Sequence, residues 1–175
     1  LVAMRDLEQV LQGIVARARQ LVGAQLAFLA SYDPDRSRFH MRATDGAVSV
    51  RLPQLTLERG YGMISLIADS GVPRQSSRYA QDDRFVHNPE VDAIFREEGI
   101  DSLLGVPLPF GTEVVGILYV GDRYSRTYLG WEISMLSTLA AHAAVAMHNA
   151  RAFEDARDAL RQAGEANARL AKQAA

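Results

Sequence analysis

The alternation of apolar and polar positions along the chain predicts two β-hairpins. The first consists of residues 26–32 and 38–44, which are joined by a polar, proline-containing turn. The second consists of two runs rich in β-branched residues, 103–108 and 114–120, with a short glycine-containing connection between them. Both runs of the second hairpin are apolar on each alternating face, which indicates that both faces are buried. We therefore expect an antiparallel sheet with this hairpin at its centre.

Helical spacing predicts an amphipathic helix at each end of the chain. Apolar residues recur every three or four positions over residues 3–22, and Gly23 follows. The same spacing begins again near Trp131, and nothing interrupts it before Gly164. This predicts a second helix of more than about 30 residues. Its first part has a wide apolar face rich in alanine, as expected for a helix that packs closely on a sheet.

The second helix changes character near residue 152, where its apolar face narrows to a stripe. The stripe has alternating spacings of three and four and consists of Phe153, Ala156, Leu160, Ala163, Asn167, Leu170 and Ala174. Such a pattern is typical of a two-helix seam, in which one polar residue such as Asn167 can fix the register of the helices. We therefore expect a globular domain over residues 1–152, a coiled-coil-like linker over residues 153–175 within a longer protein, and a homodimer formed through the terminal helices.

The middle of the chain predicts short elements that cross one face of the sheet. We expect edge strands at 47–52 and 72–75, and short helices at 63–68 and 89–98, with a polar loop at 77–88. Aromatic residues of these elements, with residues of both hairpins, either line a small-molecule cavity or fill the core, and the sequence leaves both readings open. The candidate pocket residues are Phe28, His40, Arg42, Tyr61, Tyr79, Phe85 and Phe95, with Leu104, Val106 and Leu118 as the floor.

Composition narrows the classes of function. The chain has 175 residues, of which 48% are hydrophobic, and a formal net charge of −2 without a basic block, so we expect no nucleic acid to bind to this segment itself. It contains no cysteine, which excludes disulfides, thiolate catalysis and thiolate-bound zinc. No apolar run reaches the length of about 20 residues that a membrane-spanning helix needs. We therefore expect no membrane partner and a cytoplasmic location.

Motifs for catalysis or cofactor binding are weak. Residues 60–65, with Asp82 further along, look like a dinucleotide-binding fingerprint, but that motif needs a parallel strand-helix-strand unit and the hairpins predict an antiparallel sheet. His142 and His148 lie six positions apart on a helix and therefore face different directions. The paired acidic residues are adjacent in the chain, which does not place two carboxylates across a substrate. We expect no enzymatic activity, no metal and no cofactor.

The pattern as a whole resembles the GAF family of sensory domains. The matching segments are L-V-G-A at 21–24, the first hairpin, R-G-Y-G-M-I-S-L-I-A-D-S-G-V-P-R at 59–74, Y-A-Q-D-D-R-F at 79–85, the second hairpin at 102–122, and L-S-T-L-A-A-H-A-A-V-A-M-H-N-A-R-A-F at 136–153. The resemblance covers residues 3–155. The stretch 78–108 looks most like GAF domains that precede helix-turn-helix output domains in bacterial transcription regulators.

The resemblance implies an α+β fold. It has a central antiparallel sheet of five or six strands, the N- and C-terminal helices on one face, and short helices and loops over a pocket on the other. Such domains bind small molecules or chromophores and signal through helices that often dimerise. Bilin-attaching and methionine-sulfoxide-reducing members use cysteine, which this chain lacks, and the motif of cyclic-nucleotide-binding members is absent around Asn88.

The function that the resemblance implies is small-molecule sensing in a bacterial transcription regulator or other signalling protein, with the signal leaving through the C-terminal helix. Two alternatives stay open. One is a dimerisation and interaction module that has kept the fold without a ligand, and the other is a sensor that precedes a cyclase or kinase.

Overall fold

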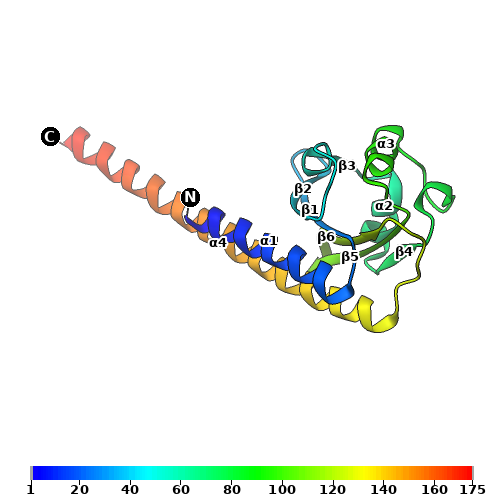
Figure 1. Ribbon diagram of the computed structural model, residues 1–175. Helices are drawn as coiled ribbons and strands as arrows, with labels where there is room; N and C mark the ends of the chain where they lie inside the picture. The colour runs from blue at the N-terminus through cyan, green and yellow to red at the C-terminus, as the bar shows by residue number, and fades with distance from the viewer. Residues whose placement is uncertain (1, 175) are drawn as a thin grey trace.

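The computed structural model describes residues 2–174 and has three layers. A six-stranded antiparallel sheet with strand order β3-β2-β1-β6-β5-β4 forms the middle layer. The helices α1 and α4 lie side by side against one face, and the shorter helices α2 and α3 cover the other (Figure 1). The predicted α+β class and its arrangement of layers are confirmed.

Both predicted hairpins form, and they lie next to each other in the sheet. The strands are β1 (Leu26–Asp33), β2 (Arg38–Asp45), β3 (Thr56–Glu58), β4 (Arg74–Ser76), β5 (Ser102–Phe110) and β6 (Glu113–Asp122). The hairpins join through β1 and β6, where Leu29 pairs with Leu118. The β5–β6 hairpin thus lies inside the sheet, as its apolar faces predict.

The structure has four α-helices, of which α3 is capped at both ends by residues that the sequence supplies. They are α1 (Val2–Val22), α2 (Gly62–Ser70), α3 (Pro89–Glu98) and α4 (Gly130–Ala174), with 3-10 turns at Leu52–Gln54 and Tyr79–Gln81. The Asn88 side chain accepts hydrogen bonds from the backbone N–H groups of Glu90 and Val91, which caps α3. Gly99 ends α3 in the left-handed region at φ 78°.

One predicted strand does not form. Residues 47–52 are an irregular segment that leads into a 3-10 turn, and the edge strand on this side is β3 instead. The backbone N–H groups of Val48 and Ser49 donate to the Glu98 carboxylate of α3 at 2.7–3.1 Å. Because these groups are engaged by a side chain, they are not available for a strand ladder, and the prediction for 47–52 is wrong.

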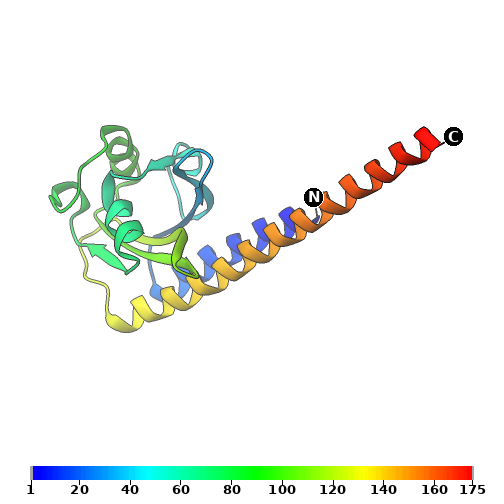
Figure 2. The ribbon, with the colours of Figure 1, turned by 180° about the vertical axis from the view of Figure 1, so that it is seen from behind.

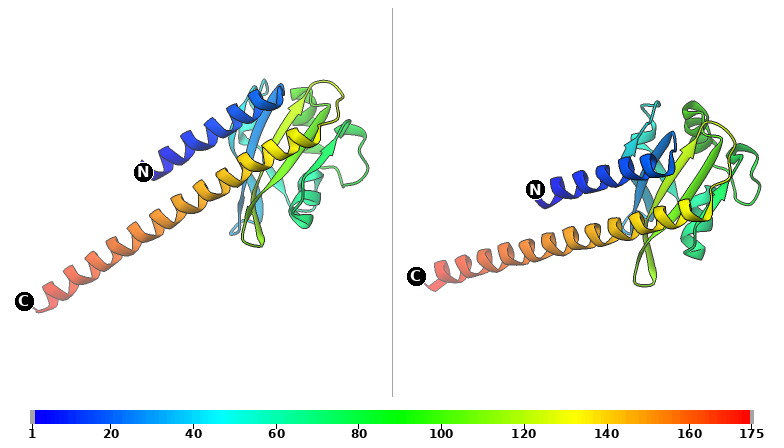
Figure 3. Two further views of the ribbon diagram at one scale, coloured as in Figure 1. Left: turned by 90° about the horizontal axis from the view of Figure 1, so that it is seen from below. Right: turned by 60° about the horizontal axis from the view of Figure 1, so that its bottom comes forward.

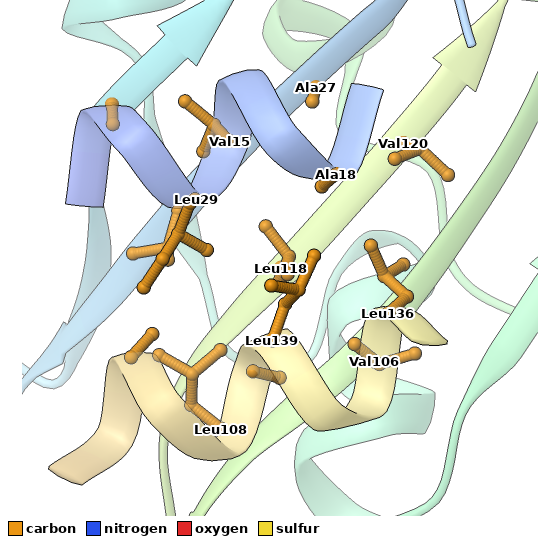
Figure 4. Close-up of a cluster of buried hydrophobic side chains, with 14 of the residues drawn as sticks. Val15, Ala18, Ala27, Leu29, Val106, Leu108, Leu118, Val120, Leu136 and Leu139 are labelled. Atoms are coloured by element: carbon orange, nitrogen blue, oxygen red, sulfur yellow. The ribbon is translucent and has the colours of Figure 1, made fainter. Parts of the chain in front are cut away.

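Each face of the sheet has its own hydrophobic core. The first cluster packs α1 and α4 against the sheet, with Val15 and Ala18 of α1 and Leu136 and Leu139 of α4 turned toward it (Figure 4). The second cluster lies under α2 and α3 and includes Phe28. The sheet therefore separates a helix-packing face from the face on which a pocket is expected.

A β-bulge in the central hairpin determines which residues face which core. Leu108 pairs with Gly116 but Pro109 pairs with Val114, so that Val115 is an extra residue in β6. Val114 consequently packs against the second cluster and Val115 against the first. If the side chains of β6 alternated strictly between the two faces along the whole strand, Val114 and Val115 would each be assigned to the wrong face.

The long helix α4 has two parts in different environments. Its first turns run along α1 against the sheet, and the remainder extends beyond the domain (Figures 2 and 3). All residues from 155 to 174 are exposed. The helix has no break at residue 152, so the predicted domain boundary there stays a prediction. The predicted segments 1–152 and 153–175 each include one residue, 1 and 175, that lies outside the described residues.

Candidate functional site

The space under α2 and α3 is almost completely filled by side chains of the chain itself. The remaining cavity has a volume of about 10 Å³ and is bordered by Tyr61 just before α2, Met63 of α2, Phe95 of α3, and Leu103 and Tyr119 of the sheet. That volume corresponds to about one water molecule. In this conformation the cavity therefore has no room for a metabolite.

Aromatic side chains fill this space. The structure brings together four of the predicted pocket residues, namely Phe28, Tyr79, Phe85 and Phe95. Phe28 stacks on Tyr119 with ring centres 4.7 Å apart, and Tyr79 contacts the rings of Phe85 and Phe95 at 5.2 and 5.0 Å. A ligand that entered here would have to displace part of this cluster.

The Tyr79 hydroxyl lies against the start of α2. A Cβ added at Gly62 would approach it to 3.1 Å, so the glycine leaves room for the tyrosine, and the φ of 70° at Gly62 also favours glycine. Burial, with the charges of Asp92 and Asp82, raises the pKa of Tyr79 well above its ordinary value. The hydroxyl is therefore protonated and serves as a neutral polar group inside the cluster.

The predicted floor residues face the other way. Leu104, Val106 and Leu118 belong to the first cluster, and Figure 4 shows Val106 and Leu118 beside side chains of α1 and α4. Their neighbours Leu103 and Tyr119 border the cavity instead. Because side chains alternate along a strand, an assignment that is one residue out moves the whole set to the opposite face. The assignment of these three residues to the pocket is wrong.

His40 and Arg42 also lie outside the cavity. Both contact the Ser31 hydroxyl, at 3.4 and 3.3 Å, while Phe39 and Met41 next to them on β2 pack against the second cluster. Burial lowers the pKa of Arg42, and the nearby charges of Glu8 and Glu154 in the terminal helices partly oppose this effect. These two residues therefore belong to the helix-packing side of the sheet, and their assignment to the pocket is wrong.

Tyr61 lies at the rim of the cavity, with 41% of its surface exposed. It is the N-cap residue of α2, and the N–H of the following residue, Gly62, donates to the Val86 carbonyl oxygen at 2.7 Å. This bond joins the start of α2 to the loop before α3. Tyr61 is the predicted pocket residue that a molecule approaching from solvent meets first.

His87 fastens the loop between the 3-10 turn and α3, a role that the sequence did not reveal. Its Nδ1 lies 2.9 Å from a carboxylate oxygen of Asp92, and its Nε2 lies 2.6 Å from the backbone oxygen of Asp82. Both partners can only accept, so the doubly protonated ring satisfies both contacts. The ring also packs on Tyr79 and Phe85. The spacing of His87 and Asp92 across the Asn88 cap is the only sequence signal for it.

The pKa of His87 reflects opposing influences. Burial lowers it, but the hydrogen bonds to the Asp82 backbone and the Asp92 carboxylate, with the charges of both aspartates, raise it more. The net shift is upward from the ordinary value. Arg84 donates to the Asp82 carboxylate at 2.6 and 2.9 Å, which holds the pKa of Asp82 well below its usual range and keeps that group charged.

A larger groove lies outside the domain core. It has a volume of about 570 Å³ and runs between the end of α2, the tips of both hairpins and α4. Phe110 at the hairpin tip stacks on His148 of α4 with ring centres 4.0 Å apart, and Arg59 pairs with Asp69 at 3.5 Å. No sequence pattern predicts this groove, because it is formed by segments that are far apart in the chain.

The predicted seam residues are all on the solvent-exposed part of α4. Phe153, Leu160 and Leu170 have 56%, 75% and 62% of their surfaces exposed, and Asn167 is exposed as well. Among the described residues, no group of three or more His, Asp or Glu side chains is arranged to hold a metal ion. Within residues 2–174, no helix combines the length and the hydropathy of a membrane span.

Comparisons with known proteins agree with this architecture. The GAF domain family model matches residues 4–148, so the chain belongs to the GAF domain family. GAF domains are sensory and regulatory modules of signalling proteins. The comparison with curated protein sequences gave no match.

Three solved structures illustrate the range of proteins that share this fold. The GAF domain of a phosphoenolpyruvate-protein phosphotransferase from Coxiella burnetii is 28% identical, with 85% of this chain and 86% of that chain covered and a TM-score of 0.74. The PixJ GAF domain from Thermosynechococcus elongatus, solved in a blue-light-absorbing form, is 16% identical, with coverage of 93% and 96% and a TM-score of 0.70. A free methionine-R-sulfoxide reductase from Thermoplasma acidophilum is 13% identical, with coverage of 84% and 96% and a TM-score of 0.67, so the fold also occurs in an enzyme.

Proposed function

We propose that this chain is the sensory module of a cytoplasmic bacterial signalling protein, most similar to those of transcription regulators, and that it works as a homodimer whose signal leaves through α4. The observation that carries the proposal is the continuity of α4. One unbroken helix of 45 residues packs on the sheet at its start and carries an exposed apolar stripe at its end. A movement at the sheet therefore shifts the stripe directly.

A second copy of the chain is the partner that fits this stripe. Most helical stability in proteins comes from packing of an apolar face, and the stripe of α4 has no such packing within one chain, since all residues from 155 to 174 are exposed. At about 100° per residue, Leu160 lies about 240° around the helix axis from the buried Leu136, so the stripe faces away from the domain core. In a parallel dimer, each Asn167 would meet its own counterpart, which fixes the register.

The proposed input is a small molecule under α2 and α3. Because the cavity holds about one water molecule, binding requires Tyr79, Phe85 or Phe95 to move, and such a movement displaces the helices that cover the site. The ligand must favour one helix arrangement over the other by about 1–3 kcal/mol to bias an attached output domain. Closure of the site around its own aromatic residues would then be the unliganded state.

A ligand-free interaction module is the second candidate, and the filled cavity favours it. Among the described residues, no buried side-chain nitrogen or oxygen lacks a hydrogen-bond partner, so no polar group under α2 and α3 needs a ligand for satisfaction. On this reading the dimer is the function, and the aromatic cluster serves stability alone.

The dimer is tested by changing the stripe. The double variant Leu160→Asp/Leu170→Asp places charges on the seam, and we expect it to be monomeric by sedimentation equilibrium. The matched control, Gln162→Asp/Ala168→Asp, adds the same charges to exposed positions of the same helix off the stripe. It should remain dimeric. A seam variant that stays dimeric, or a wild-type chain that is monomeric, would overturn the proposal.

The input is tested by thermal denaturation against a panel of cellular metabolites. Sensing under α2 and α3 predicts a compound that raises the melting temperature of the wild-type chain and loses this effect in Phe85→Ala. Phe110→Ala, in the outer groove, should keep the effect. A compound with the reverse pattern binds in the groove, and a panel without any hit at millimolar concentration supports the ligand-free module.

A further inference from the structure

A line of charged residues connects the helix that covers the site with the start of α4. We propose that this line, called here the ionic chain and consisting of Glu98, Arg123, Asp122, Arg126 and Glu132, transmits movement of α3 to α4. This inference rests on the proposed role of α4 as the output helix. It places the transmission route at one edge of the domain, where the sequence contains no recognisable motif.

The ionic chain begins on α3, next to the candidate site. Glu98 lies three residues after Phe95 of the aromatic cluster, and its side chain is fully buried. Its carboxylate accepts from Arg123 at 2.9 Å, in addition to the two backbone N–H groups of the 47–52 segment. Arg123 also donates to the backbone oxygens of Glu98 and Gly46, at 2.8 and 3.1 Å. The end of α3 is thereby fixed to the residue that follows β6.

The second half of the ionic chain leads from the end of β6 to α4. Asp122, the neighbour of Arg123, is fully buried and accepts from Arg126 at 3.3 Å and from the Tyr128 hydroxyl at 2.9 Å. Arg126 donates in turn to Glu132, which lies in the first turn of α4. The other carboxylate oxygen of Glu132 accepts from the Leu129 N–H at 2.9 Å.

This last contact makes Glu132 the cap of α4. A Glu in the third position of a helix that accepts from the N-cap N–H satisfies a backbone group that has no partner within the helix. Glu132 is 2% exposed, and a glutamate is almost never this buried unless it is paired. Arg126 is the residue that compensates its charge. The position of Arg126 therefore determines how α4 is anchored.

The three carboxylates of the ionic chain are buried, with side chains 0–3% exposed, while the side chains of Arg123 and Arg126 are 29% and 18% exposed. The burial of these carboxylates is the reason to expect the members to move together. Separating one partner of a buried ion pair leaves an uncompensated charge, which is strongly unfavourable. When α3 shifts, Arg123 follows Glu98, and Asp122 follows Arg123 through the backbone. Arg126 and the α4 cap are then drawn from their positions. Exposed ion pairs on the same helix, such as Glu97 with Arg51 at 2.6 Å, lack this constraint because water can replace either partner.

Native-state hydrogen exchange of the full chain tests the proposal. The variant Glu98→Gln removes the charge at the α3 end, and the readout is exchange at the Leu129 and Ile133 amides, the first of which is bonded to Glu132 and the second to the Leu129 carbonyl. We expect exchange at these amides to rise by about tenfold relative to Leu118 in the sheet, within the range of about 5- to 150-fold for allosteric coupling factors. The neighbouring Glu97→Gln is the matched control and should leave both amides unchanged.

Two further variants keep the outcome decisive. Glu132→Gln breaks the cap directly and gives the largest increase in exchange expected at Leu129 and Ile133. Arg123→Lys keeps the positive charge but loses the forked contacts of the guanidinium group, and it replaces Glu98→Gln as the test if that variant does not fold. Faster exchange confined to α3 and residues 46–50, with Leu129 and Ile133 at wild-type rates, would overturn the ionic chain as a transmission route.

Two measurements together separate this proposal from the proposed function. They are the oligomeric state of the Leu160→Asp/Leu170→Asp variant and hydrogen exchange in Glu98→Gln. A seam variant that stays dimeric contradicts the role of α4 as a dimer helix, whatever the exchange rates. Unchanged exchange in Glu98→Gln together with a seam-dependent dimer contradicts the ionic chain alone.

Discussion

His87 shows how one side chain can hold two segments of a domain together in a protonation-dependent way. The ring lies between Asp82 of the loop and Asp92 of α3, and each nitrogen faces an oxygen that can only accept a hydrogen bond. Loss of a proton would turn one nitrogen lone pair toward an oxygen. The residue therefore stabilises the cover of the candidate site when it is charged.

The expected consequence is a stability that falls as the pH rises. Because the pKa of His87 is raised in the folded chain above its ordinary 6.5, its contribution is fully present below pH 6.5 and is lost as the pH rises through the folded-state pKa. Urea denaturation between pH 6 and about 8.5 should show this loss in wild type and not in His87→Gln. His142→Gln, at an exposed position of α4, should retain it. If the free energy of unfolding changes with pH equally in wild type and in His87→Gln, the stabilising role given to charged His87 is contradicted.

At the scale of elements, the central hairpin depends on close approach between strands. A Cβ added at Gly116 of β6 would lie 2.6 Å from the Ala30 carbonyl oxygen and 3.1 Å from the Leu108 side chain. The first of these contacts is with backbone that is held in the β1–β6 ladder, so it cannot relax without a shift of the strand. The glycine is thus required by the packing of the sheet.

We therefore expect Gly116→Ala to destabilise the domain by about 1–3 kcal/mol, as overpacking of a well-filled core does. Gly164→Ala, on the exposed part of α4 where a Cβ meets nothing within 4 Å, should instead stabilise the helix by about 1 kcal/mol. Urea denaturation followed by circular dichroism gives both values. Equal stability of Gly116→Ala and wild type would show that the strands can separate at this point without cost.

The elements themselves could be predicted because their signals are local. The hairpins, the helix at 89–98 and the long terminal helix all follow from residues within a few positions of each other. Phe28, Tyr79, Phe85 and Phe95 could be named as candidates because the type of the element that carries each one is a local signal, but the sequence left open whether they line a cavity or pack together.

What could not be predicted depends on contacts between distant segments. The face to which Leu104, Val106 and Leu118 point follows from which side of the sheet the terminal helices cover, and a periodicity of two does not carry that information. The irregular path of residues 47–52 follows from the buried carboxylate of Glu98, about 50 positions away in the sequence. The contacts of His87 include the backbone oxygen of Asp82, and no side-chain pattern in the sequence reveals where that oxygen lies.

At the scale of the whole molecule, one continuous helix joins the domain to the exposed end of α4. The helices α1 and α4 lie together on the sheet, and α4 continues without a break into the stripe (Figure 3). Exposed apolar residues on the domain part, Val10 and Leu21 of α1 and Val145 of α4, extend the surface available to a second copy. A dimer that uses both helices would pass a change in sheet packing to the linker on both chains.

The direction of the two helices in the dimer can be determined by disulfide trapping, since the chain contains no cysteine of its own. In a parallel dimer each seam position faces its counterpart, so Leu170→Cys should give a covalent dimer under mild oxidation. Gln162→Cys, on the same exposed helix but off the stripe, should remain a monomer on a non-reducing gel. In an antiparallel dimer, position 170 of one chain lies far from position 170 of the other, and Leu170→Cys would not cross-link. That result would place the two linkers at opposite ends, where two identical output domains could not be joined side by side, and would argue against transmission through a common coiled coil.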